Sequence, residues 1–84
     1  MRTAPGRGGY VLQAGAFRRT ADADRRKASL ALLGIEARVE TGTGSGGEVW
    51  HRVRIGPFAT AGEAQAMRRR LHNNNIQSIT LKAR

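Results

Sequence analysis

The sequence predicts a single α+β domain in which strands and helices follow in the order βαββαβ. Its length of 84 residues suits one domain with a modest core. Shifting the chain by 41 positions superposes Leu12–Phe17 on Val53–Phe58, and both segments end in Gly-x-Phe, which indicates two copies of one unit. The same shift aligns further apolar positions: Ala23 with Ala64, Leu30 with Leu71, and Ile35 with Ile76. With right-handed crossovers, this order gives the ferredoxin-like (RNP-like) fold, a four-stranded antiparallel sheet with two helices on one face.

The first copy contains a strand, a helix and a second strand. Residues 10–17 alternate in side-chain character and then meet a glycine, as a strand does before a turn. Residues 20–33 predict a helix with Thr20 as its N-cap and Gly34 as the left-handed residue beyond its end. Residues 35–41 predict the second strand. It carries Ile35, Ala37 and Val39 on one side and Glu36, Arg38 and Glu40 on the other.

A glycine-rich segment, residues 42–47, is expected to be a flexible hairpin loop. Its spacing Gly-x-Gly-x-x-Gly satisfies the dinucleotide-binding string, but that motif requires a helix immediately afterwards. Here residues 48–55 alternate as a third strand, which Pro57 is expected to stop. The sequence therefore favours a loop between two strands over a nucleotide site.

The second copy continues with a helix and a last strand. Residues 60–63 read Thr-Ala-Gly-Glu, which has capping-box spacing, and residues 73–75 are three asparagines that can end the helix. Residues 76–81 predict the fourth strand. We expect residues 10–82 to form the domain and residues 1–9 to be a linker. That linker has no hydrophobic segment that could serve as a signal peptide, so if the domain works outside the cytoplasm, its export signal is expected elsewhere in a longer parent protein.

The two-residue period of a strand assigns each side chain to a face of the sheet. The residues expected to face the helices are Leu12, Ala14, Ala37, Val39, Val53 and Ile55. The opposite side, which we call the open face, is expected to carry Val11, Gln13, Arg38, Trp50, Arg52, Arg54, Gln77 and Ile79. A tryptophan among arginines on an uncovered sheet is the most informative feature of the chain, and it predicts a binding surface.

The charge balance implies an acidic partner. The chain has 15 Lys plus Arg against 6 Asp plus Glu, a net charge of +9. Two runs of this charge, residues 25–27 and 68–70, are expected to be solvated outer helix faces.

The residues offer no catalytic or metal-binding set, so we expect neither an enzyme nor a cofactor. The absence of cysteine excludes disulfides and thiolate metal sites, and His51 and His72 alone cannot complete a zinc site. No serine lies in a nucleophile-elbow context. Glu36, Glu40 and Glu48 lie on or near neighbouring strands, but a general acid needs a buried carboxyl, and these are expected to be exposed.

With these features in place, the chain resembles a SPOR (sporulation-related) domain. The resemblance covers residues 10–82 and is carried by residues 10–17 (YVLQAGAF), by Ala23, Leu30 and Gly34 around the first helix, and by residues 50–58 (WHRVRIGPF). Within the family the chain looks most like the C-terminal domain of FtsN-type bacterial cell-division proteins.

The resemblance implies a non-catalytic module that binds peptidoglycan. It implies recognition of denuded glycan strands, made of N-acetylglucosamine and N-acetylmuramic acid without stem peptides, and targeting of a parent protein to the division septum in the periplasm. The module itself is expected to be a monomer that is not inserted in a membrane, although its parent can be membrane-anchored. The glycan-contacting positions carried over, with Arg54 added from its place on the open face, are Gln13, Ala16, Trp50, Arg52, Arg54 and Ile79. At residue 16 the family often has serine.

The strongest alternative is an RNA-binding module, because the RNA-recognition motif shares this topology and a basic sheet face. That motif stacks bases on aromatic residues of its first and third strands. The third strand here has Trp50 as its one aromatic residue, and aromatic residues make up 5% of the chain. We therefore expect a glycan rather than a nucleic acid as partner.

Overall fold

The computed structural model describes residues 9–82; residues 1–8, which make up most of the predicted linker, and residues 83–84 lie outside the described part. Strands and helices follow in the predicted βαββαβ order. They are β1 (Tyr10–Phe17), α1 (Thr20–Leu32), β2 (Arg38–Thr43), β3 (Val49–Phe58), α2 (Ala61–Asn73) and β4 (Ile79–Lys82). The four strands form one antiparallel sheet in the order β2-β3-β1-β4, so the predicted fold class is confirmed.

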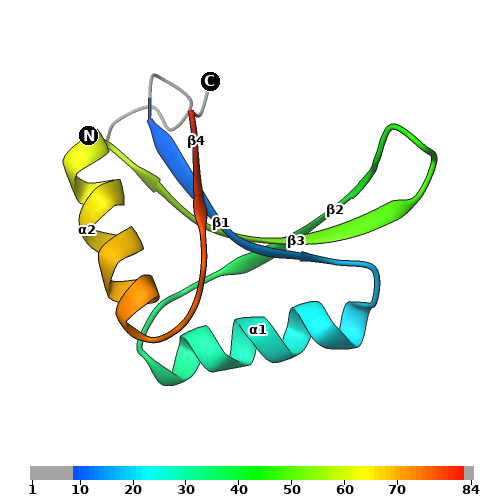
Figure 1. Ribbon diagram of the computed structural model, residues 1–84, viewed down its shortest axis with the longest axis horizontal. Coiled ribbons are helices and arrows are strands. Elements are labelled where there is room, and N and C mark those ends of the chain that lie inside the picture. The colour runs from blue at the N-terminus through cyan, green and yellow to red at the C-terminus, as the bar shows by residue number, and fades with distance from the viewer. Residues whose placement is uncertain (1–8, 83–84) are drawn as a thin grey trace.

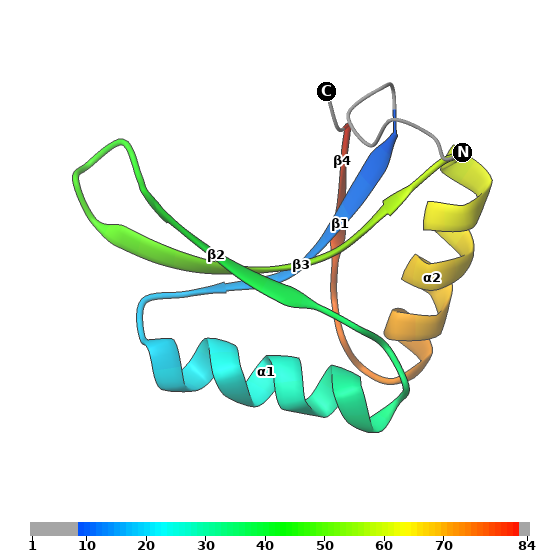
Figure 2. The same ribbon diagram turned by 180° about the vertical axis from the view of Figure 1, so that it is seen from behind.

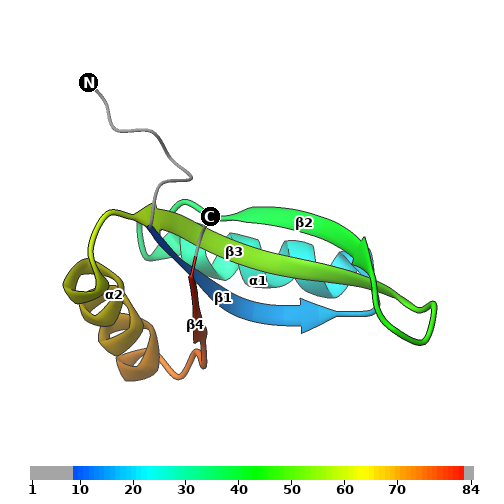
Figure 3. The ribbon, with the colours of Figure 1, turned by 90° about the horizontal axis from the view of Figure 1, so that it is seen from above.

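Both helices pack on one side of a curved sheet. Figures 1 and 2 show α1 running along this side and α2 standing at the end where β1 and β4 pair. The β2–β3 hairpin and the start of β1 both rise away from α1, so the side without helices is concave (Figure 1). Figure 3 looks onto that side, with α1 behind the strands. None of the helices in residues 9–82 has the length and apolar character needed to cross a membrane.

The core repeats the internal symmetry of the sequence. Ten buried residues form one hydrophobic cluster, and they make five pairs, each separated by 41 positions. The pairs are Leu12 and Val53, Ala14 and Ile55, Ala23 and Ala64, Leu30 and Leu71, and Ile35 and Ile76. No polar side chain of residues 9–82 is buried among them. Every strand residue predicted to face the helices therefore lies in this core or, for Ala37 and Val39, packs against it.

The two helices also end in the same way, which explains why two strands begin late. Gly34 and Asn75 have φ angles of +77° and +63°, the left-handed conformation expected beyond a helix end. The next amide in each copy bonds back to the helix, Ile35 N–H to Leu30 O and Ile76 N–H to Leu71 O, at 2.9 Å in both. Because these amides cap the helices, they cannot join the sheet. The predicted starts at residues 35 and 76 were wrong, and β2 and β4 begin three residues later.

Two β-bulges bend the sheet, and both contain the glycine of a Gly-x-Phe segment. Pairing of β1 with β3 shifts register between Gln13 and Ala16 and again opposite Tyr10 and Leu12. Gly15 and Gly56 lie at these shifts, with φ angles of +137° and +119°. A Cβ atom on Gly15 would lie 2.7 Å from the Phe17 ring, so the ring packs directly on the glycine. Bulges increase the bend and twist of a strand, which accounts for the concave side.

The third strand ends later than predicted, and the second bulge explains why. Pro57 was expected to stop it at residue 55, but β3 continues to Phe58. Pro57 lies within the register shift, where the missing N–H of proline is not required by the ladder. At the other end of the hairpin, β2 extends to Thr43, so the predicted loop is shorter than residues 42–47, and a strand follows it as expected.

The start of α1 also differs from the prediction. Thr20 is the first helical residue, and Arg19 takes the N-cap position without a side-chain cap. The Thr20 hydroxyl instead lies 3.4 Å from His51 Nε2 on β3. In α2 the predicted cap is confirmed, because Thr60 Oγ1 accepts a hydrogen bond from Glu63 N–H at 3.1 Å. Glu63 Oε1 in turn accepts from Ala59 N–H, one residue before the cap.

The basic helix runs are less free than predicted. Arg26 is half-buried, donates to Ala14 O at 2.8 Å and lies over the Phe17 ring, so it was wrongly assigned to a solvated face. In the second run, Arg68 donates to Ser78 O and Arg70 to Leu33 O, although both remain exposed. Much of the positive charge on the helices therefore has backbone partners.

The core predicts a large difference between two leucines of the same helix. Leu30→Ala should lower the free energy of unfolding by about 2–5 kcal/mol, because Leu30 is fully buried and its loss leaves a cavity. Leu32→Ala is the matched control, since Leu32 is 89% exposed, and it should change stability by less than about 0.5 kcal/mol. Urea denaturation of both variants measures the difference, and equal effects would contradict the assigned core.

Candidate functional site

One row of side chains crosses the open face through all four strands. In the pairing register, Arg38 lies opposite Arg54, Arg54 opposite Gln13, and Gln13 opposite Ile79. Directly paired residues point to the same side of a sheet, so these four side chains are neighbours in line. Ile79, at the end of the row, is 53% exposed. The centre of the open face is thus polar and its β4 end apolar.

Glu40 holds the centre of this row together. Its carboxylate accepts from Arg38 Nε at one oxygen and from Arg54 Nη1 at the other, both at 2.8 Å. Arg54 Nη2 also donates to Gln13 Oε1 at 3.4 Å. The hydrogen bond from Arg38 lowers the pKa of Glu40 below 4.5. Burial opposes this by a smaller amount, and the charges of Arg54 and Arg38 add to the lowering. Two of the three predicted open-face arginines are therefore paired with one carboxylate, which offsets half of their combined charge.

Trp50 lies at the hairpin end of the open face and is held from two sides. Its indole N–H donates to Glu48 Oε2 at 3.2 Å, and the Arg18 guanidinium carbon lies 5.3 Å from the ring centroid. Arg18 Nε donates to Val49 O at 3.2 Å, which fixes the guanidinium beside the ring. The pKa of Glu48 is lowered by backbone N–H groups and then by the indole N–H. Trp50 is therefore an oriented aromatic surface with a cation on it.

Ala16 and Arg52 lie between Trp50 and the central row. They are paired with each other across β1 and β3, and Arg52 is also paired with Glu40 across β2 and β3. Glu40 nevertheless binds Arg38 and Arg54, and within residues 9–82 the Arg52 guanidinium has no ion pair. Arg52 Nη1 lies over Gly42, 3.0 Å from where a Cβ atom of residue 42 would stand.

The sequence placed five of the six candidate residues on the open face, and the register shift at Gly15 brings Ala16 to the same face opposite Arg52, while all six binding roles stay predictions. The structure joins Gln13 to Arg54 directly and sets Ile79 beside Gln13. Ala16, Arg52 and Trp50 continue the surface toward the hairpin. Val11 also faces this side, opposite Leu81, but it is 9% exposed. Gln77 precedes β4 and lies at the helix side instead.

Sequence reasoning missed three residues of this surface: Arg18, Glu40 and Glu48. Alternation had already put Glu40 on the same side as Arg38, so a charge search along that strand could have found it. Arg18 follows the end of β1 and has no strand period to place it, and only its contact with Trp50 shows its position.

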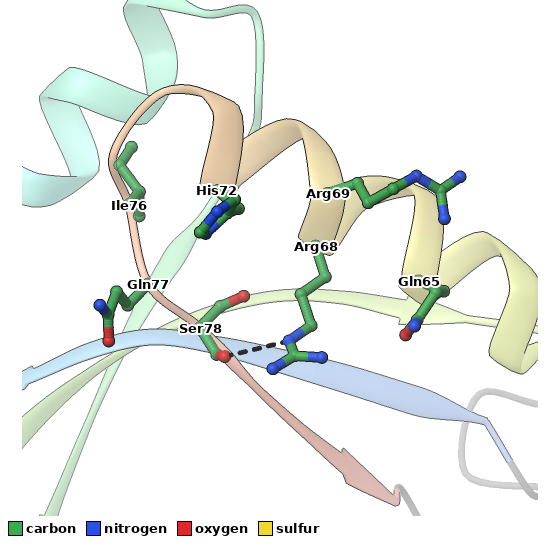
Figure 4. Close-up of a pocket in the computed structure, with 7 residues that line it drawn as sticks. All are labelled: Gln65, Arg68, Arg69, His72, Ile76, Gln77 and Ser78. Atoms are coloured by element: carbon green, nitrogen blue, oxygen red, sulfur yellow. Dashed lines mark hydrogen bonds between the residues drawn. The ribbon is translucent and has the colours of Figure 1, made fainter.

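A separate hollow of about 390 Å³ lies away from the open face, between α2 and the segment that leads into β4. Figure 4 shows Gln65, Arg68, Arg69 and His72 along α2, with Ile76, Gln77 and Ser78 opposite. Arg68 Nε donates to Ser78 O at 3.3 Å across it (Figure 4). None of the six candidate residues lines this hollow.

Glu40 and Glu48 lack the raised pKa of a general acid. A general acid needs a raised pKa, but the pKa values of Glu40 and Glu48 are both lowered by their hydrogen bonds. His51 is bound between Thr41 and Thr20, with Nδ1 3.0 Å from the Thr41 hydroxyl. Over the described range 9–82, no group of three or more His, Asp or Glu is placed to hold a metal ion.

Comparison with known proteins identifies relatives of this arrangement. The sequence model of the SPOR domain matches residues 6–82. No curated protein matches the chain. Among solved structures, the SPOR domain of RlpA from Pseudomonas aeruginosa is similar with a TM-score of 0.76 and 27% identity, covering 87% of this chain and 97% of that one. The peptidoglycan-binding domain of the B. subtilis cell wall lytic enzyme CwlC is similar with a TM-score of 0.80 and 24% identity over the whole of both chains.

The Glu40 ion pairs predict a pH-dependent contribution to stability. A carboxyl whose pKa is lowered by folding stabilises the protein above its unfolded pKa and loses that contribution as pH falls through its folded pKa. Glu40→Gln should therefore be less stable than wild type near neutral pH, and the difference should shrink as pH drops below 4.5. Denaturant unfolding from about pH 7 to about pH 3 measures it.

Glu36→Gln is the control for this experiment, because Glu36 is exposed and has no ion pair within residues 9–82. A Glu40→Gln deficit that is the same at every pH would contradict the assigned role of the charge.

Proposed function

The chain belongs to the SPOR domain family, and from this premise we propose that it is a peptidoglycan-binding module whose open face binds glycan strands. The observation that carries the proposal is Trp50, an oriented and partly exposed indole on a concave face that also presents an amide and arginines. The similar CwlC domain is described as peptidoglycan-binding, which supports the same class of ligand. As a SPOR domain, the chain is a binding module and not an enzyme.

The chemistry of the face suits a sugar polymer. A sugar ring presents C–H groups that pack on an aromatic surface such as Trp50, while its hydroxyl and acetamide groups need polar partners. Gln13 can both donate and accept, and Arg52 can donate from a planar fork. Ile79 and Ala16 supply apolar contact beside them. Ala16 lacks the hydroxyl that the family often has at this position, so one hydrogen bond to the glycan is absent.

We propose further that the preferred ligand is the denuded strand. Removing the stem peptide leaves a lactyl carboxylate on each N-acetylmuramic acid, and an arginine-bearing face attracts that charge. A retained peptide would cap the carboxylate and obstruct approach to a concave surface. Both effects favour glycan from which the peptides have been cleaved.

This ligand would place the domain in the bacterial cell envelope. We propose that it acts in the periplasm as a monomeric targeting module and brings a longer parent protein to the division septum, where denuded strands are produced. Family membership supports a wall-associated role, and the septal assignment follows from the proposed ligand.

Trp50→Ala should weaken binding to purified sacculi by about thirtyfold or more, because large aromatic residues carry much of the binding energy of such surfaces. The measurement is a sacculus pull-down, with thermal unfolding to verify the fold. Val49→Ala is the control, since Val49 is the adjacent residue, is 46% exposed and points to the other side of the strand. Unchanged binding by Trp50→Ala would refute the proposed face. Tight binding to single-stranded RNA that fades steeply with salt, with no binding to sacculi, would favour the RNA alternative.

The preference for denuded strands predicts a difference between two preparations of the same sacculi. Amidase-treated sacculi, from which stem peptides have been removed, should retain more of the domain than untreated sacculi at equal mass. Sacculi treated with heat-inactivated amidase provide the control. Equal retention on all three preparations would rule out the denuded strand as the preferred ligand while leaving peptidoglycan binding intact.

A further inference from the structure

The positive charges of the open face fall into two groups that differ in what surrounds them. In the central row, Arg38 and Arg54 share the Glu40 carboxylate at 2.8 Å each. Toward the hairpin, Arg18 and Arg52 lie near Trp50, and no ion pair within residues 9–82 involves either of them. An arginine that is already paired with a carboxylate has less to gain from a second anion. The two groups therefore differ in their capacity to bind one.

Arg18 is positioned as a ligand contact by two independent interactions. Its Nε donates to Val49 O at 3.2 Å, and its guanidinium lies 5.3 Å from the Trp50 centroid. Both interactions leave the two terminal nitrogens available, and the side chain is exposed. A planar guanidinium fixed in this way is preorganised, so less side-chain entropy is lost when it binds an oxyanion.

Arg52 approaches the same end of the face from the neighbouring strand. Gly42 is the cross-strand partner of Trp50, and Arg52 Nη1 lies over that glycine. The space exists because residue 42 has no side chain. Glu48 is the carboxylate nearest the indole, but it accepts from Trp50 Nε1 and forms no ion pair with Arg18 or Arg52. Two guanidinium groups without an ion pair in residues 9–82 thus lie at the Trp50 end of the open face, Arg18 over the indole and Arg52 over the glycine paired with Trp50.

We infer that Arg18 and Arg52, together with Trp50, form an anion subsite that binds a carboxylate of the ligand, whereas Arg54 and Arg38 do not. The inference rests on the proposed glycan function and specifies which arginines bind the carboxylates of the glycan strand. It assigns a binding role to Arg18, and it gives Arg54 a different one: held by Glu40, Arg54 orients the Gln13 amide toward uncharged groups of the sugar.

The test compares two ligands that differ only in charge. One is a denuded glycan oligosaccharide with free lactyl carboxylates, and the other is the same oligosaccharide with those carboxylates converted to methylamides. Calorimetric titration at fixed ionic strength gives the dissociation constants. Arg18→Gln and Arg52→Gln should each weaken binding of the free-acid form by about three- to tenfold, the range expected for one charge-assisted contact. Binding of the methylamide form should change by less than about twofold.

Two further variants separate a specific contact from a general loss of charge. Arg69→Gln removes the same charge from the exposed outer part of α2 and should change binding of either ligand by less than about twofold. Arg18→Lys keeps the charge but not the planar stack, so it should retain most of the preference for the free acid. Circular dichroism and thermal unfolding verify that each variant folds.

The outcomes distinguish the inference from the function on which it rests. If wild type binds neither oligosaccharide, the proposed function and the subsite both fail. If wild type binds and Arg18→Gln behaves like Arg69→Gln, the proposed function stands and the subsite is wrong. An equal loss of both ligands in Arg18→Gln would also overturn the subsite, because it would show that Arg18 supports Trp50 rather than binding a carboxylate.

Discussion

Burial of ten apolar side chains on one side of a single sheet is the constraint from which the rest of this structure follows. The chain has no cysteine, so this cluster is the main source of its stability. Because the two halves contribute equivalent residues 41 positions apart, both helices must cover the same side. Residues 9–82 contain no further helix or strand to place on the other side. The open face is therefore a direct result of how the core is built.

The shape of that face depends on two glycines. Gly15 and Gly56 lie at register shifts between the two central strands, where a side chain would collide with Phe17 or approach Phe58 and Tyr10 closely. The same bulge that bends β1 also leaves the Ala14 carbonyl to accept from Arg26, so an arginine of α1 stabilises the bend from the helix side. Curvature, core and open face are thus coupled through the Gly-x-Phe segments that made the internal repeat visible in the sequence.

This coupling explains how much the sequence could predict. Residues that belong to a strictly periodic pattern, such as Leu30 and Leu71 in the helices or the alternating strand residues 50–55, can face the core from only one side of their element. Their faces were predicted correctly. Strand starts at residues 35 and 76 failed because a helix-capping hydrogen bond competes for the same amide, which periodicity does not reveal. The partners of Glu40 and the position of Arg18 depend on side-chain rotamers, and several arginines compete for each carboxylate. Those contacts could be found only in three dimensions.

The distribution of charge bears on what kind of polyanion suits this domain. A net charge of +9 would favour any nucleic acid if the cations were free and adjacent, because such binding scales with the number of phosphates neutralised. Here Glu40 compensates the centre of the open face, and Arg26, Arg68 and Arg70 donate to backbone carbonyls on the helices. What remains on the concave side is a short basic region around one indole, beside an amide and an exposed isoleucine. After this region a continuous phosphate backbone would meet a row in which two arginines already share one carboxylate, so less charge is free to pair with phosphate. A strand whose carboxylates are separated by uncharged sugar groups needs fewer free cations and matches this surface better.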